Sequence, residues 1–136
     1  MFLNVLDVSI NSLAEHALGF KFQAFCGRYK DMATADPLVL SRFRAVLEAL
    51  YGPRIERVVL YGSRARGDAD ADSDYDVAVF LKDLEDRWAE TAKIARAAVT
   101  IFDETGGLIH AMPYAAGSYL ARTPLMHEMR REGVDL

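Results

Sequence analysis

A glycine–serine pair and two aspartates that flank a single residue restrict this chain more than any other feature. Gly62 and Ser63 follow a short run of apolar, β-branched residues, which is typical of a strand. After ten intervening residues, Asp74 and Asp76 lead into a second apolar run, which predicts a more buried strand. The connection between the two strands therefore carries chemically active residues at both ends, and its backbone serves something other than packing.

The two aspartates indicate a metal site. On a strand, residues two apart point to the same face and lie about 6.5 Å apart along the chain. Two carboxylates in that arrangement repel each other unless a cation lies between them. Mg²⁺ prefers oxygen ligands and is usually held by one or two carboxylates together with substrate phosphates. Asp74 and Asp76 are therefore candidate Mg²⁺ ligands and catalytic residues, although the same triplet alone also occurs at ordinary strand entries.

Gly62 and Ser63 indicate a phosphate site beside the metal. The pair ends the first predicted strand and opens a short predicted helix through Arg64 and Ala65. A helix start offers unpaired N–H groups to an anion, the Ser63 hydroxyl adds a donor, and a glycine lets the backbone approach a phosphate closely. Arg64 is a candidate for steering phosphate. With the aspartates, these residues describe a site for a nucleoside triphosphate and its metal.

The order of strand, Gly-Ser, ten residues, Asp-x-Asp and apolar strand resembles the signature of the minimal nucleotidyltransferases, a small branch of the DNA polymerase β-like nucleotidyltransferase superfamily. The resemblance extends from about Asp36 to the C-terminus. It implies an α+β fold, with a small mixed β-sheet backed by helices. It also implies transfer of AMP from ATP to a hydroxyl, with release of pyrophosphate. Asp74 and Asp76 would then hold two Mg²⁺ ions. Ser63 and the backbone around Gly62 would grip the terminal phosphates.

The third predicted strand, Leu108 to Met112, departs from the family pattern. Members of the family usually carry a third carboxylate there, which completes the metal site and helps to deprotonate the attacking hydroxyl. This segment contains no acid, and His110 is the one titratable residue well inside it. His110 is either a structural histidine or, because a neutral imidazole can accept a proton, a catalytic base. The missing acid weakens the case for catalysis more than the case for nucleotide binding.

The acceptor hydroxyl is expected on another protein, because the chain is too short to include a second, acceptor-binding domain. In the minimal family the partner is often a HEPN-domain toxin ribonuclease, which is neutralised by AMP addition (AMPylation) to a tyrosine, so the resemblance implies an antitoxin role. Two alternatives stay open. One is a catalytically degenerate nucleotide-binding antitoxin that acts by steric contact. The other is a dimeric transferase for a small aminoglycoside-like substrate, suggested only by the acidic loop of Asp68, Asp70 and Asp72.

Composition is that of a single domain and argues against several classes of protein. At 136 residues the chain can bury about two thirds of its unfolded surface. A formal net charge of −4 argues against direct nucleic-acid binding, which usually needs a basic patch. No apolar run approaches the roughly 18 residues of a membrane span. The first residues lack a basic signal-peptide start, and the single cysteine, Cys26, cannot form an internal disulfide. We therefore expect a cytoplasmic protein, and whether it forms a homo-oligomer stays open.

Residues 1–31 do not resemble the family core. They are predicted to be an N-terminal extension, either helical or outside the native domain. The nucleotidyltransferase domain is accordingly predicted to span residues 36–136.

Within that domain, Asp36 is the expected N-cap of a first helix that ends before Gly52. A long amphipathic helix is predicted from about Leu84 to Glu104, with Trp88 as a core anchor. A last helix is expected from Thr123 to about Glu132. Arg66 is expected to pair with a nearby acid.

Overall fold

The computed structural model describes residues 35–136, which belong to the second of the two units, Met1–Asp31 and Met32–Leu136, into which the chain divides. The predicted extension, residues 1–31, lies outside the described residues, and its role stays a prediction. The elements of the described part are, in chain order, α3 (Pro37–Tyr51), the 3-10 helix η1 (Gly52–Arg54), β1 (Ile55–Tyr61), α4 (Ser63–Arg66), β2 (Tyr75–Leu81), α5 (Arg87–Thr105), β3 (Ile109–Ala115), the 3-10 helix η2 (Ser118–Leu120), α6 (Pro124–Glu132) and β4 (Val134–Asp135).

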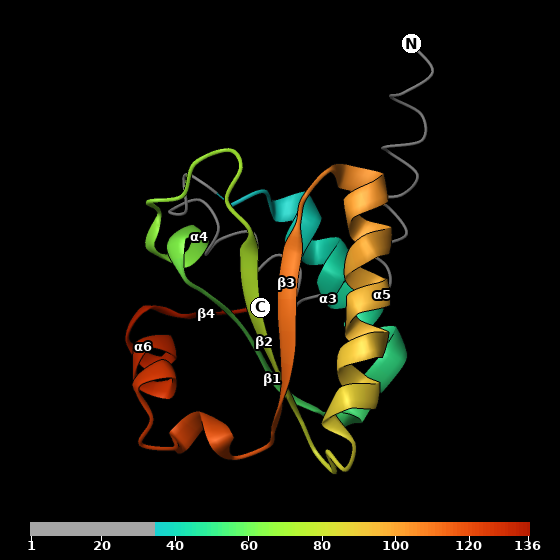
Figure 1. Cartoon of the computed structure of the whole chain (residues 1–136), viewed down its shortest axis with the longest axis vertical. Helices are drawn as coiled ribbons and strands as arrows, with labels where there is room; N and C mark the ends of the chain where they lie inside the picture. Colours follow the sequence, from blue (N-terminus) through green and yellow to red (C-terminus); the bar gives the residue numbers. More distant parts are fainter. Residues whose placement is uncertain (1–34) are drawn as a thin grey trace. The chain divides into compact units, whose positions relative to one another are not determined.

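The four strands form one mixed sheet in the order β3-β2-β1-β4. β1 runs antiparallel to both β2 and β4, whereas β2 and β3 run parallel and are connected through α5. A parallel pair needs a long crossover connection, which is usually a helix. Figure 1 shows α3 and α5 on one side of the sheet and α6 on the other. The predicted α+β class, with a small mixed sheet backed by helices, is confirmed.

α3 begins where the sequence predicts. The Asp36 carboxylate accepts a hydrogen bond from the backbone N–H of Leu38 at 2.9 Å, which caps the helix. Pro37 takes the first helical position, where its missing N–H has no cost. Gly52 ends the helix with φ at 50°. The face of α3 that packs inward consists of Val39, Leu40, Phe43, Leu47 and Tyr51.

α5 differs from its prediction in its start and in its buried face. The helix begins at Arg87, because the side chain of Asp86 accepts hydrogen bonds from the N–H groups of Trp88 and Ala89 and so acts as the N-cap. Trp88 is 83% exposed, so its prediction as a core anchor was wrong. Ile94 lies on the buried face of the helix. Trp88 is six residues before Ile94, which places it about 120° around the helix axis from Ile94 at 3.6 residues per turn. Trp88 therefore points to solvent.

The opposite face of the sheet carries a second, smaller core. Val59, Ala78 and Phe80 pack there with Met126 and Met129 of α6. β4, which the sequence pattern did not predict, pairs with β1 directly after α6 and closes that edge of the sheet. Among the described helices, none has the length and apolar character needed to cross a bilayer.

Candidate functional site

The predicted glycine–serine turn lies at the end of β1. α4 begins at Ser63, directly after Gly62, so the predicted short helix is confirmed. Gly62 has φ 74° and ψ −156°, a backbone conformation that is essentially restricted to glycine. A Cβ atom at this position would lie 2.5 Å from Oδ2 of Asp76. The missing side chain of Gly62 therefore leaves the space that the Asp76 carboxylate occupies.

Asp76 lies between two neighbouring strands that also carry polar side chains. It is the second residue of β2, paired with Tyr61 of β1 and with His110 of β3. Side chains alternate along a strand, so Asp76 shares its face with Ala78, a member of the core beneath α6. Its side chain is 33% exposed, because it lies at the open end of that face. The turn and the carboxylate thus meet on the α6 side of the sheet.

Asp74 is exposed and lies one residue before β2, since the strand begins at Tyr75. The predicted strand after Asp74 is confirmed, with Asp74 just before it and Asp76 as its second residue. Partial burial raises the pKa of the Asp76 carboxyl above its ordinary value, and the charge of Asp74 raises it further. His110 and Arg66 lower that pKa, but they do not cancel the effect of burial. His110 and Arg66 therefore do not fully compensate the negative charge of Asp74 and Asp76.

The donor set fits Mg²⁺ held jointly with a phosphorylated substrate. Among residues 35–136, no three His, Cys, Asp or Glu side chains gather closely enough to hold a metal ion by themselves. Asp74 and Asp76 supply two carboxylates, and Mg²⁺ commonly takes one or two carboxylates and completes its shell with water and substrate phosphates. Because Gly62 has no side chain, the Asp76 carboxylate lies directly against the turn that would receive those phosphates. The two aspartates are thus the residues that would hold the ion.

His110 lies on β3, the strand on which the sequence led us to expect a third carboxylate. Its position on β3 pairs with Asp76, and its Nδ1 lies 3.5 Å from Oδ1 of Asp76. The imidazole is 62% exposed, so His110 is not a buried structural histidine, and a hydrogen-bonded structural role stays a prediction. β3 carries no acid along its length. The imidazole is therefore the titratable group that β3 presents to the aspartates, and its catalytic role stays a prediction.

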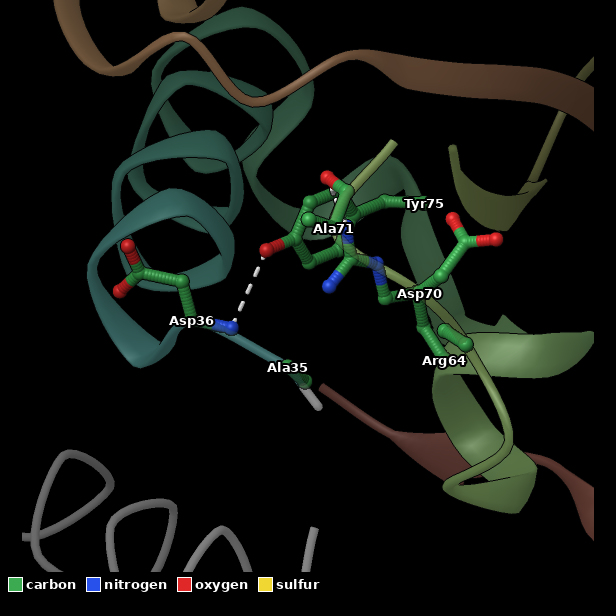
Figure 2. A pocket seen from close by; sticks show the side chains of 7 residues that line it. Ala35, Asp36, Arg64, Asp70, Ala71 and Tyr75 are labelled. Carbon is green, nitrogen blue, oxygen red and sulfur yellow. Dashed lines mark hydrogen bonds between the residues drawn. The ribbon is translucent and has the colours of Figure 1, made fainter. Parts of the chain in front are cut away.

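Arg64 is buried, which is rare for an arginine that is not held by several partners. Its guanidinium donates hydrogen bonds to the backbone carbonyls of Ala71 and Ser73. The guanidinium carbon also lies 4.5 Å from the ring centroid of Tyr75, and Figure 2 shows these two side chains together. Since side chains alternate along β2, Tyr75 and the guanidinium lie on the opposite side from Asp76. The Arg64 side chain thus binds the segment that precedes β2. Its direct contact with a nucleotide stays a prediction.

Arg66 pairs with acids, as the sequence predicts. Its guanidinium contacts Asp68 at 3.2 Å, Glu128 at 3.4 Å and Glu132 at 3.3 Å. The two glutamates belong to α6, so Arg66 joins α4 to that helix. Asp68 is thus an ion-pair partner of Arg66, and all three acids of the connection, Asp68, Asp70 and Asp72, are exposed.

Sequence reasoning missed two tyrosines beside the site. Burial raises the pKa of Tyr61 to about 12, with contributions from Tyr114 and Asp76, so its hydroxyl stays protonated at neutral pH. Tyr75 lies between the two aspartates in the sequence, and its hydroxyl accepts a hydrogen bond from the N–H of Asp36 at 3.1 Å. Because side chains alternate along a strand, the sequence already indicates that Tyr75 faces away from Asp76. The position of Tyr61 beside Asp76 follows only from the pairing of β1 with β2.

Comparisons with known proteins agree with this geometry. Residues 40–129 match the family model of the nucleotidyltransferase domain. A "putative protein adenylyltransferase" of Methanocaldococcus jannaschii is 35% identical over 46 residues, a match that covers 34% of this chain and 46% of the relative. The crystal structure of a "putative nucleotidyltransferase" from Sulfolobus solfataricus superposes with a TM-score of 0.51 at 19% identity, covering 72% of this chain and 76% of that chain. The likeness to the Sulfolobus structure concerns the fold alone. The sequence match spans less than half of the Methanocaldococcus relative.

Proposed function

This chain belongs to the nucleotidyltransferase domain family, and we propose that it transfers AMP from ATP to a hydroxyl group with release of pyrophosphate. The observation that carries the proposal is the close approach of Asp76 to the Gly62 turn, where a Cβ atom would lie 2.5 Å from the carboxylate. A turn that could receive phosphates and a carboxylate that could hold their metal are thereby brought to one place.

In the proposed reaction, the acceptor oxygen attacks the α-phosphorus of ATP. The bond from the α-phosphorus to the oxygen that bridges it to the β-phosphorus breaks, pyrophosphate leaves with that bond's electron pair, and the hydroxyl proton passes to a base. Asp74 and Asp76 would hold Mg²⁺, which when bound neutralises triphosphate charge and activates the hydroxyl. Gly62 and Ser63 would bind the terminal phosphates. His110 is the candidate base, because its Nδ1 lies 3.5 Å from Asp76.

The acceptor is proposed to be a hydroxyl of another protein. The relative from Methanocaldococcus jannaschii is described as a "putative protein adenylyltransferase", which supports a protein acceptor for this chain as well. Within this proposal, the family resemblance favours a tyrosine of a HEPN-domain toxin, and AMP addition would give the chain an antitoxin role. A small-molecule acceptor has no comparable support from the described residues.

A second candidate function is nucleotide binding without transfer. The observation that favours it is the absence of an acid on β3, since the position paired with Asp76 is His110. In that case the chain would act on its partner by contact alone. The two functions differ in whether label moves from ATP to an acceptor.

The test is incubation of the full chain with α-labelled ATP, Mg²⁺ and a HEPN-domain protein, together with calorimetric titration of Mg·ATP. The decisive variant is Asp74→Asn with Asp76→Asn, which should abolish Mg·ATP binding and labelling. Its thermal stability should be unchanged or slightly raised, because the neutral amides no longer repel each other. Asp83→Asn with Asp103→Asn removes the same charge from two exposed positions and should leave binding intact. Undiminished Mg·ATP affinity in the Asp74 and Asp76 variant would overturn the metal assignment. Binding without label on any acceptor would favour the second function.

A further inference from the structure

The side chain of Arg64 spans residues 64–73, the ten-residue segment between Ser63 and Asp74. The backbone of Arg64 belongs to α4, one residue after Ser63. Its guanidinium reaches the carbonyl of Ser73, the residue before Asp74, at 2.8 Å, and the carbonyl of Ala71 at 3.3 Å. The hydrogen bonds therefore close the connection on itself, from the phosphate end of the site to the carboxylate end.

The segment that Arg64 grips is already ordered by bonds of its own. The Asp70 carboxylate accepts hydrogen bonds from the N–H of Asp72 and the hydroxyl of Ser73, both at 3.1 Å. The Ser73 hydroxyl in turn accepts from the N–H of Asp70 at 3.1 Å. Residues 70–73 thus form a self-bonded turn, and a contact to its carbonyls moves or holds the turn as a unit.

Tyr75 fixes the guanidinium from the other side. The ring lies 4.5 Å from the guanidinium carbon, and a cation over an aromatic face is attracted to it. The Tyr75 hydroxyl accepts from the N–H of Asp36, the N-cap of α3, so the ring is itself tied to a helix of the core (Figure 2). Tyr75 is 3% exposed and lies between Asp74 and Asp76 in the chain. A shift of this ring would therefore move both aspartates.

We propose that Arg64, seated on Tyr75, is a positioning residue that sets the placement of Asp74 and Asp76 relative to the Gly62–Ser63 turn. The proposal rests on the proposed function of the site, because positioning is measured as Mg·nucleotide affinity. Arg64 acts through the connection and from the face of β2 opposite Asp76. Its loss would leave the carboxylates present but displaced from the turn.

The test compares Arg64→Ala with Arg57→Ala in the full chain. Arg57 offers a matched control, since its guanidinium also lies over a tyrosine ring, that of Tyr119 at 4.2 Å, and also donates two hydrogen bonds, to Asp135. Each variant loses one charge, one ring contact and a set of hydrogen bonds. We expect Arg64→Ala to weaken Mg·ATP binding by about 10–100-fold, the loss typical when a group that orients metal ligands is removed. Amide exchange across residues 68–73 should accelerate as well. Arg57→Ala should change neither quantity.

Chemical rescue separates positioning from a general loss of structure. A cavity of about 380 Å³ lies beside Arg64, lined in part by Ala35, Asp36 and Tyr75, so a small cation can enter where the side chain is missing (Figure 2). Millimolar ethylguanidinium should restore Mg·ATP affinity and slow amide exchange in Arg64→Ala. It should have no effect in Arg57→Ala.

Several outcomes would overturn the proposal. These are wild-type Mg·ATP affinity in Arg64→Ala, an equal loss of affinity in Arg57→Ala, and a loss that ethylguanidinium does not reverse. If Arg64→Ala fails to fold, Arg64→Lys replaces it, because lysine keeps the charge but cannot bond both carbonyls through a planar fork. Wild-type affinity in Arg64→Lys would then refute the role. A wild-type chain that binds no Mg·ATP would instead overturn the proposed function, and exchange across residues 68–73 would still decide whether Arg64 holds the connection.

Discussion

Replacement of Gly62 by alanine tests the geometry of the site directly. The backbone there has φ 74° and ψ −156°, and an added Cβ would lie 2.5 Å from Oδ2 and 3.4 Å from Cγ of Asp76. Gly62→Ala therefore imposes two separate strains. One belongs to the backbone, and the other forces the Asp76 carboxylate out of its place.

The two strains have different magnitudes. A non-glycine residue held in this region of φ and ψ costs about 1–3 kcal/mol. Turning the Asp76 side chain away from a favoured rotamer to relieve the contact costs about 0.5–1.5 kcal/mol more. The sum, about 1.5–4.5 kcal/mol, corresponds to a fall in Tm of about 6–36 °C, because 1 kcal/mol shifts a domain of about 100 residues by about 4–8 °C.

A double-mutant cycle separates the two strains. In an Asp76→Ala background the clashing atoms are absent, and the remaining approach to the Cβ of residue 76, at 3.5 Å, is an ordinary contact. Gly62→Ala should then cost only its backbone part. Gly117→Ala is the matched control, because Gly117 also has positive φ, 86°, but nothing lies within 4 Å of an added Cβ. Urea unfolding gives the energies, and calorimetry gives the Mg·ATP affinity.

The expected result is that Gly62→Ala loses Mg·ATP binding, whereas Gly117→Ala is destabilised but still binds. Equal costs of Gly62→Ala in the wild-type and Asp76→Ala backgrounds would show that the carboxylate does not occupy this space. Wild-type nucleotide affinity in Gly62→Ala would refute the argument that the turn and Asp76 form one site.

Two further predictions concern titratable side chains. His110→Ala should slow transfer by about 10²–10⁴-fold, the usual worth of a general base, whereas His110→Asp should retain transfer; single-turnover rates that are indifferent to both changes would contradict this role. Glu90 is buried, and although burial opposes ionisation, the Tyr51 hydroxyl and the Lys93 ammonium hold the pKa of its carboxyl below the ordinary value. A carboxyl with a lowered folded pKa stabilises the fold above its unfolded pKa and loses that contribution as the pH falls through the folded pKa. Glu90→Gln should therefore cost about 1.5–3 kcal/mol at pH 7 and progressively less below pH 4.5, and urea unfolding that shows a constant difference across this range would contradict it.

The sequence predicted the local structure around the candidate site better than it predicted the long helix that backs the sheet. The glycine–serine turn, the short helix at Ser63 and the apolar strand after Asp74 follow from local signals, because glycine, strand composition and spacing act over a few residues. Trp88 was misplaced for the opposite reason. Small alanines occupy both candidate stripes of α5, so periodicity alone could not decide which stripe faces the sheet, and the cap at Asp86 sets where the helix starts.

Long-range pairing accounts for most of what the sequence could not predict. β4 contains only two residues, too few to show any alternation, and it exists because α6 returns the chain to the edge of β1. The placement of Tyr61 and His110 beside Asp76 depends on strand register, which no local pattern states. Arg64 has the composition of a phosphate-binding residue, and only the fold shows that its guanidinium is engaged by the carbonyls of Ala71 and Ser73.

Binding and transfer make different demands on this site. Binding of a metal–triphosphate requires carboxylates for the metal and a turn that can approach phosphates; Asp74 and Asp76 are proposed for the first need, and the turn at Gly62, which lies against Asp76, for the second. Transfer also requires a group that takes the proton of the acceptor hydroxyl, and β3 offers only the imidazole of His110 beside Asp76. In the proposed reaction, either that imidazole accepts the proton, or the proposed protein acceptor brings its own base. In the second case, substitutions at His110 would not change the rate, whereas substitutions at Asp74 and Asp76 would. The site would then be complete only when the proposed acceptor is bound.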